Sequence, residues 1–324
     1  MPRSRKSQIN LSSTAYYHCV SRCVRQCFLC GFDSRSGIDY EHRRDWLENR
    51  ILQLGSVMSI NVCAYAVMSN HTHLVLHIDS EQAASWSNFE VLTRWHALHK
   101  GTLLTSAYLS KASRNKMTSM EIASVEDVIE IYRKRLCDIS WFMRLLNEYI
   151  ARKANKEEKR VGRFWEGRYY SQALLDEAAL LTCMAYVDNN PIRANMSDHP
   201  KRSDFTSIKM RMNTNNHFNN SLASFEDTIG LCGMEFRLPF RYADYCKIVQ
   251  DTAKVIIEQS KDIHDVLIQD KLTINGSKWL ELNLHLESHF SYAIGTALSL
   301  DRYRKNCNLQ RVKGRGQAKR LFNM

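Results

Sequence analysis

The alternation of apolar and polar positions is clearest in residues 61–79, which read NVCAYAVMSNHTHLVLHID. The first half of this stretch is apolar and β-prone, a Ser-Asn pair supplies turn chemistry, and residues 71–78 resume as a second strand. The pattern therefore predicts a β-hairpin. Because successive side chains on a strand point to opposite faces, His71, His73 and His77 share one face. The other face carries Thr72, Leu74, Leu76 and Ile78.

Two histidines separated by one residue on a strand indicate a metal site that is incomplete by itself. His71 and His73 are expected about 7 Å apart along one face. From that separation two imidazoles can converge on one divalent ion, but they leave part of its coordination shell to other residues. The remaining ligands must come from elsewhere in the chain.

The elements around the hairpin predict a compact α+β fold. Residues 14–24 have the alternation of a first strand, and residues 40–54 place apolar side chains at helical spacing before the hairpin. The order β, α, β, β begins a ferredoxin-like antiparallel sheet with helices on one face. We expect His71 and His73 to lie on the uncovered face.

After the hairpin, the pattern is helical with one polar interruption. Apolar residues recur at helical spacing in residues 86–98, 125–135 and 139–153. Residues 100–118 are polar and irregular, and they predict an inserted loop or a surface element.

Residues 176–190, DEAALLTCMAYVDNN, form the clearest predicted helix. Acidic residues suit its N-terminal end, and Pro191 forces it to end. Tyr186 and Asn190, four residues apart, project together from a face with small neighbours. Taken alone, such a face is more often an ordinary amphipathic edge, with Tyr186 half buried and Asn190 acting as a helix cap.

A basic patch with aromatic residues precedes this helix. Residues 159–170, KRVGRFWEGRYY, interleave cations with aromatic rings, a mixture suited to holding phosphates while bases stack. The alternative is a loop-to-strand transition whose aromatic residues are core and whose arginines are solvated. With one residue of the first strand added, the predicted DNA-binding set is Arg22, Lys159, Arg160, Arg163 and Arg168.

A change of character near residue 203 predicts two parts, a domain of residues 1–200 and a mainly helical C-terminal extension of residues 201–324. Within residues 302–320 there are eight Lys or Arg and no acid, which is consistent with a flexible arm on a phosphate backbone, although such tails are often merely solvated. The segments of the extension that look helical are residues 242–259, 262–272, 279–286 and 291–300.

Composition narrows the class of partner. The 324 residues include 45 Lys or Arg against 34 Asp or Glu, and this net charge of +11 favours nucleic acid over a membrane surface. No run of about 18 apolar residues is present, so no membrane span is expected. The ten cysteines without a signal peptide indicate a reducing compartment, and we expect a cytoplasmic, nucleoid-associated protein.

A CxxC pair offers a competing metal hypothesis. Cys27 and Cys30, with Cys19 and Cys23 upstream and His18 beside them, could hold a structural zinc. A second pair at conventional spacing is absent from the sequence, and Cys19 and Cys23 also fit one face of a strand as small hydrophobic residues.

Together these pieces indicate metal-assisted phosphoryl transfer. A divalent ion held by His71 and His73 and completed by an amide oxygen would polarise a phosphodiester, and a tyrosine hydroxyl could attack the phosphorus in line. A phosphotyrosine ester conserves the energy of the phosphodiester for rejoining, whereas water would discard it.

Two segments of the sequence resemble a known family. AYAVMSNHTHLVL resembles the HUH motif of the single-tyrosine transposases, and FWEGRYYSQALLDEAALLTCMAYVDNNPIRA resembles a downstream segment of the REP-associated and related insertion-sequence transposases. The resemblance covers roughly residues 14–194. It implies His71 and His73 as metal ligands, Asn190 as the third ligand and Tyr186 as the nucleophile.

The same resemblance implies a partner, which is single-stranded DNA with a hairpin. A homodimer would cut it through a 5′-phosphotyrosine intermediate with a free 3′-hydroxyl. A His, His, Asn ligand set with open positions would accept Mg²⁺ or Mn²⁺ as cofactor, and affinity order alone does not choose between them. One departure is Thr72 between the two histidines, where the family usually has a hydrophobic residue; a β-branched side chain still fits the covered face.

Other interpretations stay open at this point. Tyr149 is a rival nucleophile, although Lys153 one turn later is no metal ligand and the apolar stripe explains Tyr149 as core. A catalytically silent relative could bind nucleic acid as a regulator. A metal-dependent hydrolase could use His71 and His73 to activate water without a covalent adduct.

Overall fold

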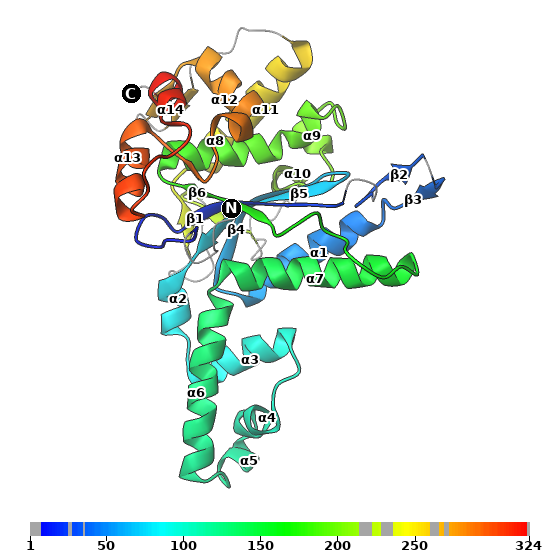
Figure 1. The fold of residues 1–324 in the computed structure, drawn as a ribbon, viewed down its shortest axis with the longest axis vertical. Coiled ribbons are helices and arrows are strands. Elements are labelled where there is room, and N and C mark those ends of the chain that lie inside the picture. The colour runs from blue at the N-terminus through cyan, green and yellow to red at the C-terminus, as the bar shows by residue number, and fades with distance from the viewer. Residues whose placement is uncertain are drawn as a thin grey trace.

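A five-stranded sheet forms the centre of the molecule, with helices on both faces (Figure 1). The computed structural model describes residues 8–24, 28–34, 36–213, 222–227, 236–259, 266–268 and 272–322. The strand order is β11-β6-β1-β5-β4. These strands are β1 (Tyr16–Arg22), β4 (Ile60–Val67), β5 (His71–Ile78), β6 (Tyr170–Leu174) and β11 (Ala293–Ile294).

The first four of these strands confirm the predicted ferredoxin-like antiparallel sheet. β1 pairs with β5 and β6, and β5 pairs with β4, all antiparallel. The predicted hairpin is β4 and β5, and the predicted helix before it is α1 (Arg43–Val57). β11 adds a short parallel strand to the edge at β6.

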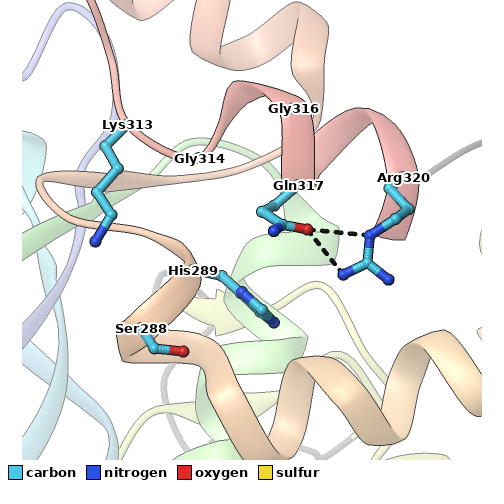
Figure 2. Close-up of a pocket in the computed structure, with 7 residues that line it drawn as sticks. All are labelled: Ser288, His289, Lys313, Gly314, Gly316, Gln317 and Arg320. Carbon is cyan, nitrogen blue, oxygen red and sulfur yellow. Dashed lines mark hydrogen bonds between the residues drawn. The ribbon is translucent and has the colours of Figure 1, made fainter.

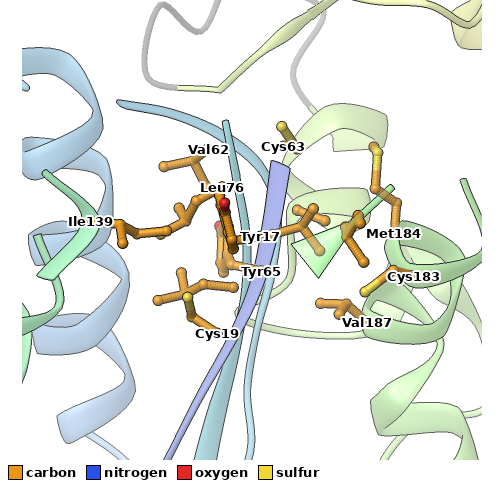
Figure 3. Close-up of a cluster of buried hydrophobic side chains, with 14 of the residues drawn as sticks. Tyr17, Cys19, Val62, Cys63, Tyr65, Leu76, Ile139, Cys183, Met184 and Val187 are labelled. Atoms are coloured by element: carbon orange, nitrogen blue, oxygen red, sulfur yellow. The ribbon is translucent and has the colours of Figure 1, made fainter. Parts of the chain in front are cut away.

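The expectation of an uncovered second face is wrong. Helices α1 and α7 (Ile139–Glu157) lie on one side of the strands, and α8 (Glu177–Asp188) lies over the other. Figure 3 shows Ile139 of α7 on one side and Cys183, Met184 and Val187 of α8 on the other. Every residue of α8 after Glu177 is buried. A helix that is apolar on all sides packs against neighbours on more than one side, so α8 covers the sheet face that was expected to be open.

The start of α8 is fixed by Asp176, whose Oδ1 accepts a hydrogen bond from the Ala179 backbone N–H at 2.9 Å. Its Oδ2 accepts the Thr296 N–H at 2.8 Å, so one carboxylate joins α8 to the residues after β11. Helix α12 (Gly276–His289) packs on the outer side of α8. The C-terminal residues thus contribute to the layer that covers the sheet.

Between β5 and α7 the chain forms helices that extend away from the sheet (Figure 1). Residues 100–118, predicted as an inserted loop or a surface element, contain two short helices, because Thr102 and Ser110 cap them at their N-termini. The helices of this segment are α2 (Ser80–Ser85), α3 (Asn88–Leu98), α4 (Leu103–Leu109), α5 (Lys111–Arg114) and α6 (Ser119–Leu136).

The C-terminal segment differs from its predicted form in two places. Residues 262–272 were expected to be helical, but their described part includes β9 (Val266–Ile268) and the start of β10 (Leu272–Ile274), which pair with each other. The basic tail is not an extended arm: it forms α13 (Ala297–Asn306) and α14 (Arg315–Leu321), and Ala318 and Leu321 are buried. Apolar residues between the cations anchor it.

Most of the remaining described elements are short. None of the helices in the described ranges is both long and apolar enough to cross a membrane. These elements are β2 (Phe32–Asp33), β3 (Ile38–Asp39), α9 (Asn190–Arg193), η2 (Pro200–Arg202), α10 (Ser207–Asn213), β7 (Ser224–Phe225), β8 (Arg237–Leu238) and α11 (Tyr242–Glu258).

Candidate functional site

Three neighbouring strands place a chain of buried polar side chains beneath α8. Gln172 of β6 lies opposite His18 of β1, and His73 of β5 is near His18 on the same face. His18 Nδ1 lies 2.8 Å from Gln172 Oε1, and His18 Nε2 lies 2.9 Å from His73 Nδ1. All three residues are buried, with 1% exposure or less.

These distances determine where the protons are, given the orientation of the Gln172 amide. An amide oxygen only accepts, so His18 Nδ1–H donates to it. His18 Nε2 then accepts from His73 Nδ1–H, which leaves the lone pair on His73 Nε2. By the same argument His71 Nδ1–H donates to Asn70 Oδ1 at 2.6 Å and keeps its lone pair on Nε2. Both histidines of the predicted motif are therefore in the tautomer that binds metal through Nε2.

The electrostatic surroundings keep these rings neutral. Burial lowers the pKa of His71 to about 4, with smaller contributions in the same direction from Arg22 and Arg193. Burial also lowers the pKa of His73 well below its ordinary value, with a contribution from His18. Neutral imidazole is the form that ligates a metal ion.

Tyr186 on α8 faces this histidine pair. Its ring lies edge-on to His18 and His73, with centroid distances of 6.2 and 5.9 Å. The guanidinium carbon of Arg193 is 3.7 Å from the Tyr186 ring centroid. Burial raises the pKa of the Tyr186 hydroxyl, and Arg193 opposes this rise by favouring the phenolate.

Asn190 is close to Tyr186 in sequence but not on the same helix. The predicted helix ends at Asp188, two residues early, because Asn189 adopts φ −89° and ψ 4° and Pro191 sits in the first turn of α9. Asn190 is 7% exposed, and its Nδ2 has no hydrogen-bond partner among the described residues. Its assignment as a metal ligand remains a prediction.

A carboxylate from the C-terminal segment reaches the same place. Glu287 Oε1 lies 3.5 Å from His73 Nδ1. Ligand atoms of His18, His73 and Glu287 lie within 4.8 Å of one another, and this is the one His, Cys, Asp or Glu group of that kind in the described ranges. The structure therefore offers a second donor set that shares His73 with the predicted one.

A cleft of about 360 Å³ opens beside these residues. Arg22 and Arg168 from the predicted DNA-binding set line it, together with Tyr170 and Glu287. Lys159, Arg160 and Arg163 do not line it, and Arg160 pairs with Glu158 at 3.3 Å. The predicted basic set is thus divided between this cleft, which we call the Arg22–Arg168 cleft, and a surface outside it.

The expectation that the aromatic residues of the basic patch stack bases is wrong for three of the four. Phe164, Trp165 and Tyr169 are between 4% and 9% exposed, whereas Tyr170 is 38% exposed. Trp165 Nε1 donates to the Asn147 carbonyl at 2.8 Å. The apolar rings of Phe164, Trp165 and Tyr169 contribute more to stability in the core than they would at the surface.

Other sequence candidates lie away from this site. His77 stacks on Phe236 with a centroid distance of 3.7 Å. Tyr149 is 39% exposed rather than core, and it lines a separate pocket with Arg50 of α1 and cations of α7. The prediction that Tyr149 belongs to the core is wrong, because this position lies at the edge of the buried face of α7.

The cysteine hypothesis gains no support in the described residues. Cys19, Cys23 and Cys30 are buried and form no disulfide, and burial raises the pKa of Cys30 to about 12, which disfavours the thiolate that zinc requires. Cys27 lies outside the described residues.

A second pocket of about 460 Å³ lies between the end of α12 and α14 (Figure 2). Ser288 and His289 line it on one side, and Gln317 and Arg320 on the other. Figure 2 shows the Arg320 guanidinium hydrogen-bonded to Gln317, which holds this wall of the pocket together.

Sequence reasoning did not assign Gln172, Arg193 or Glu287 to the site, and it considered His18 only for a structural zinc. The alternation of the first strand places His18 on the opposite face from Tyr17 and Cys19. A βαββ order places that strand next to the strand that carries His71 and His73. That combination was a usable signal for His18. No sequence signal connects Glu287 to residues more than two hundred positions earlier.

Comparisons with known proteins leave the family open. No family model and no curated protein matches the chain. A solved structure that matches is titled "Structure of the REP associates tyrosine transposase bound to a REP hairpin". It has 10% sequence identity and a TM-score of 0.38, and the match covers 65% of this chain and 86% of that one. A TM-score this low carries no argument, so the functional assignment depends on the site itself.

Proposed function

We propose that this protein is a metal-dependent DNA strand transferase of the single-tyrosine kind, which cleaves and rejoins single-stranded DNA. One observation carries the proposal. The Tyr186 ring packs against the Arg193 guanidinium and lies edge-on to the buried imidazoles of His18 and His73. The His71 ring lies 4.7 Å from that of His73. A nucleophile, a cationic partner and metal-binding nitrogens are thus within one small volume.

The residues present fit a divalent ion. His71 and His73 carry lone pairs on Nε2, and each has its Nδ1–H bonded to a partner that fixes the ring. Asn190 supplies an amide oxygen as third ligand in this proposal. A bound Mg²⁺ or Mn²⁺ would polarise a phosphodiester oxygen and offset developing negative charge.

The protein's own groups then carry out the transfer. The Tyr186 oxygen attacks phosphorus, a new O–P bond forms, and the P–O3′ bond breaks. The DNA 5′-phosphate becomes esterified to Tyr186, and the proton of the phenol is balanced by the one gained by the departing 3′-hydroxyl. Attack by a 3′-hydroxyl on the phosphotyrosine reverses the step and rejoins the strand.

The charges around the site suit this substrate. Arg22 and Arg168 in the Arg22–Arg168 cleft would contact phosphates on either side of the scissile bond. Lys159, Arg160 and Arg163, outside that cleft, would follow the strand as it leaves. The net charge of +11 favours long-range attraction of DNA. A hairpin in the DNA and a homodimer are part of the proposal through the motif resemblance alone.

A covalent-adduct assay tests the function. The protein is incubated with labelled single-stranded hairpin DNA and Mg²⁺ or Mn²⁺, then denatured and separated by electrophoresis. We expect a labelled, denaturation-resistant adduct in the wild type and in Tyr149→Phe, and none in Tyr186→Phe.

The other outcomes contradict the proposal in distinguishable ways. DNA binding without cleavage under either metal favours the silent nucleic-acid-binding relative. Cleavage without an adduct favours the hydrolase. An adduct that survives Tyr186→Phe assigns the nucleophile to another residue.

A further inference from the structure

Glu287, in the C-terminal segment, reaches the histidine cluster. Helix α12 departs from helical geometry at His285 (φ −128°, ψ 19°), two residues before Glu287. After this kink the carboxylate lies 3.5 Å from His73 Nδ1 and also lines the Arg22–Arg168 cleft. The change of helix direction thus places the Glu287 carboxylate between the histidines and the cleft.

One oxygen of this carboxylate lacks a partner. Glu287 Oε1 is buried and has no hydrogen-bond partner among the described residues, although the side chain as a whole is 32% exposed. A buried carboxylate oxygen without a partner destabilises a folded protein. Arg22 and Arg168 line the same cleft, and a cation bound at the adjacent histidines would add positive charge next to this oxygen.

His73 already has the arrangement that supports a ligand through its second nitrogen. Its Nδ1–H points to His18 Nε2, and His18 is in turn held by Gln172. Ligating histidines usually donate their other N–H to a carboxylate or another acceptor, which fixes the ring and raises its basicity. Here the acceptor is a neutral imidazole, and Glu287 adds the negative charge that His18 lacks.

We propose that Glu287, supplied by the C-terminal segment, and His18 are positioning residues that orient and polarise His73 for metal binding. The inference rests on the proposed function for the identity of the metal ligands. It makes α12 part of the active site, because a domain ending at residue 200 would lack this carboxylate.

The placement of α12 is secured independently of the histidines. Glu281, on the same helix, pairs with Arg320 of α14 and lies 3.1 Å from His289 Nε2. Trp279 is fully buried, and its Nε1 donates to Thr252 Oγ1 at 2.8 Å. Glu287 is therefore held by contacts that a substitution at its own side chain leaves intact.

Mn²⁺ binding to the full-length protein without DNA tests the proposal, with free Mn²⁺ followed by electron paramagnetic resonance. Glu287→Gln and His18→Asn should each weaken Mn²⁺ affinity by about 10- to 100-fold, the usual cost of losing such a partner. Glu258→Gln, the same charge change on an exposed residue of α11, should leave affinity unchanged. If His18→Asn fails to fold, Gln172→Leu replaces it and should show the same loss.

Two results would overturn the proposal. Glu287→Gln with wild-type Mn²⁺ affinity removes any role for the carboxylate. Loss of all binding in Glu287→Gln, with binding retained in His71→Ala, makes Glu287 a direct ligand with His18 and His73. Neither result depends on a DNA adduct, so failure of this inference and failure of the proposed strand transfer are separate observations.

Discussion

At the residue scale, the site works through groups whose charge is set by burial. His71 and His73 stay neutral because they are withdrawn from water among arginines, and neutrality is what metal binding requires. Burial also favours the neutral form of Tyr186, but here the neutral phenol is a weaker nucleophile than the phenolate. Arg193 is the group that reduces this penalty, and the balance between the two is testable.

Replacing Arg193 with Ala should slow adduct formation and shift its dependence on pH. Without the guanidinium over the ring, the pKa of Tyr186 rises, and less phenolate is present at a given pH. We expect about a 10-fold slower reaction at pH 7, the factor of one pKa unit. The rate should recover as the pH is raised.

The control is Arg202→Ala, which removes an exposed arginine paired with Asp198. It should leave both the rate and its pH profile unchanged. An Arg193→Ala rate that is low at every pH would show that Arg193 acts on the phosphate and not on the phenol.

His77 provides a prediction about stability that is independent of the metal. Burial lowers its pKa to about 4 in the folded protein, against an ordinary value of 6.5. As the pH falls from 6.5 towards 4, the unfolded chain takes up a proton that folded His77 does not, so stability is lost in this window. The loss amounts to about 1.4 kcal/mol for each pKa unit.

Urea unfolding of wild type and His77→Gln at pH 7 and pH 5 measures this contribution. The variant loses the stack on Phe236, so its stability at pH 7 is lower. Between the two pH values, however, it should lose less stability than the wild type does. Equal losses would show that His77 is not neutral in the folded state.

At the element scale, the sequence predicted what local pattern controls. The hairpin, α1 and most of α8 follow from alternation, helical spacing and a capping aspartate. For α4 and α5 the sequence predicted a loop or a surface element without identifying helices, because hydroxyl caps rather than an apolar stripe support them. It also missed β9, because three-residue strands depend on a partner that local sequence does not specify.

The tail that was expected to be flexible yields an element-scale prediction. Gly314 has φ +100°, and a Cβ there would lie 2.5 Å from Phe290 Cδ1 and 3.0 Å from the His289 carbonyl oxygen. Gly314→Ala should therefore destabilise the protein by about 1–3 kcal/mol in urea unfolding. Gly316→Ala, which meets nothing within 4 Å, should be neutral or stabilise α14 by roughly 0.5–1 kcal/mol. Equal stability of both variants would mean that α14 does not dock.

At the scale of the whole molecule, the site combines segments from both predicted parts. His18, His73 and Tyr186 fall within residues 1–200, whereas Glu287 comes from the extension. The paired histidines, Tyr186 and two of the five basic residues could be located from motifs and charge. Glu287 could not, because its approach depends on how α12 packs on α8 and on the kink at His285. The boundary at residue 200 stays a prediction.

The most direct measurement is the identity of the covalent bond. A single-stranded hairpin DNA is labelled in separate preparations at its 5′ and 3′ ends, and the denatured adduct is digested and sequenced by mass spectrometry. We predict that the 3′-end label stays with the protein and that the 5′-phosphate is attached to the peptide containing Tyr186. Attachment at any other residue, or retention of the 5′-end label, would contradict the account.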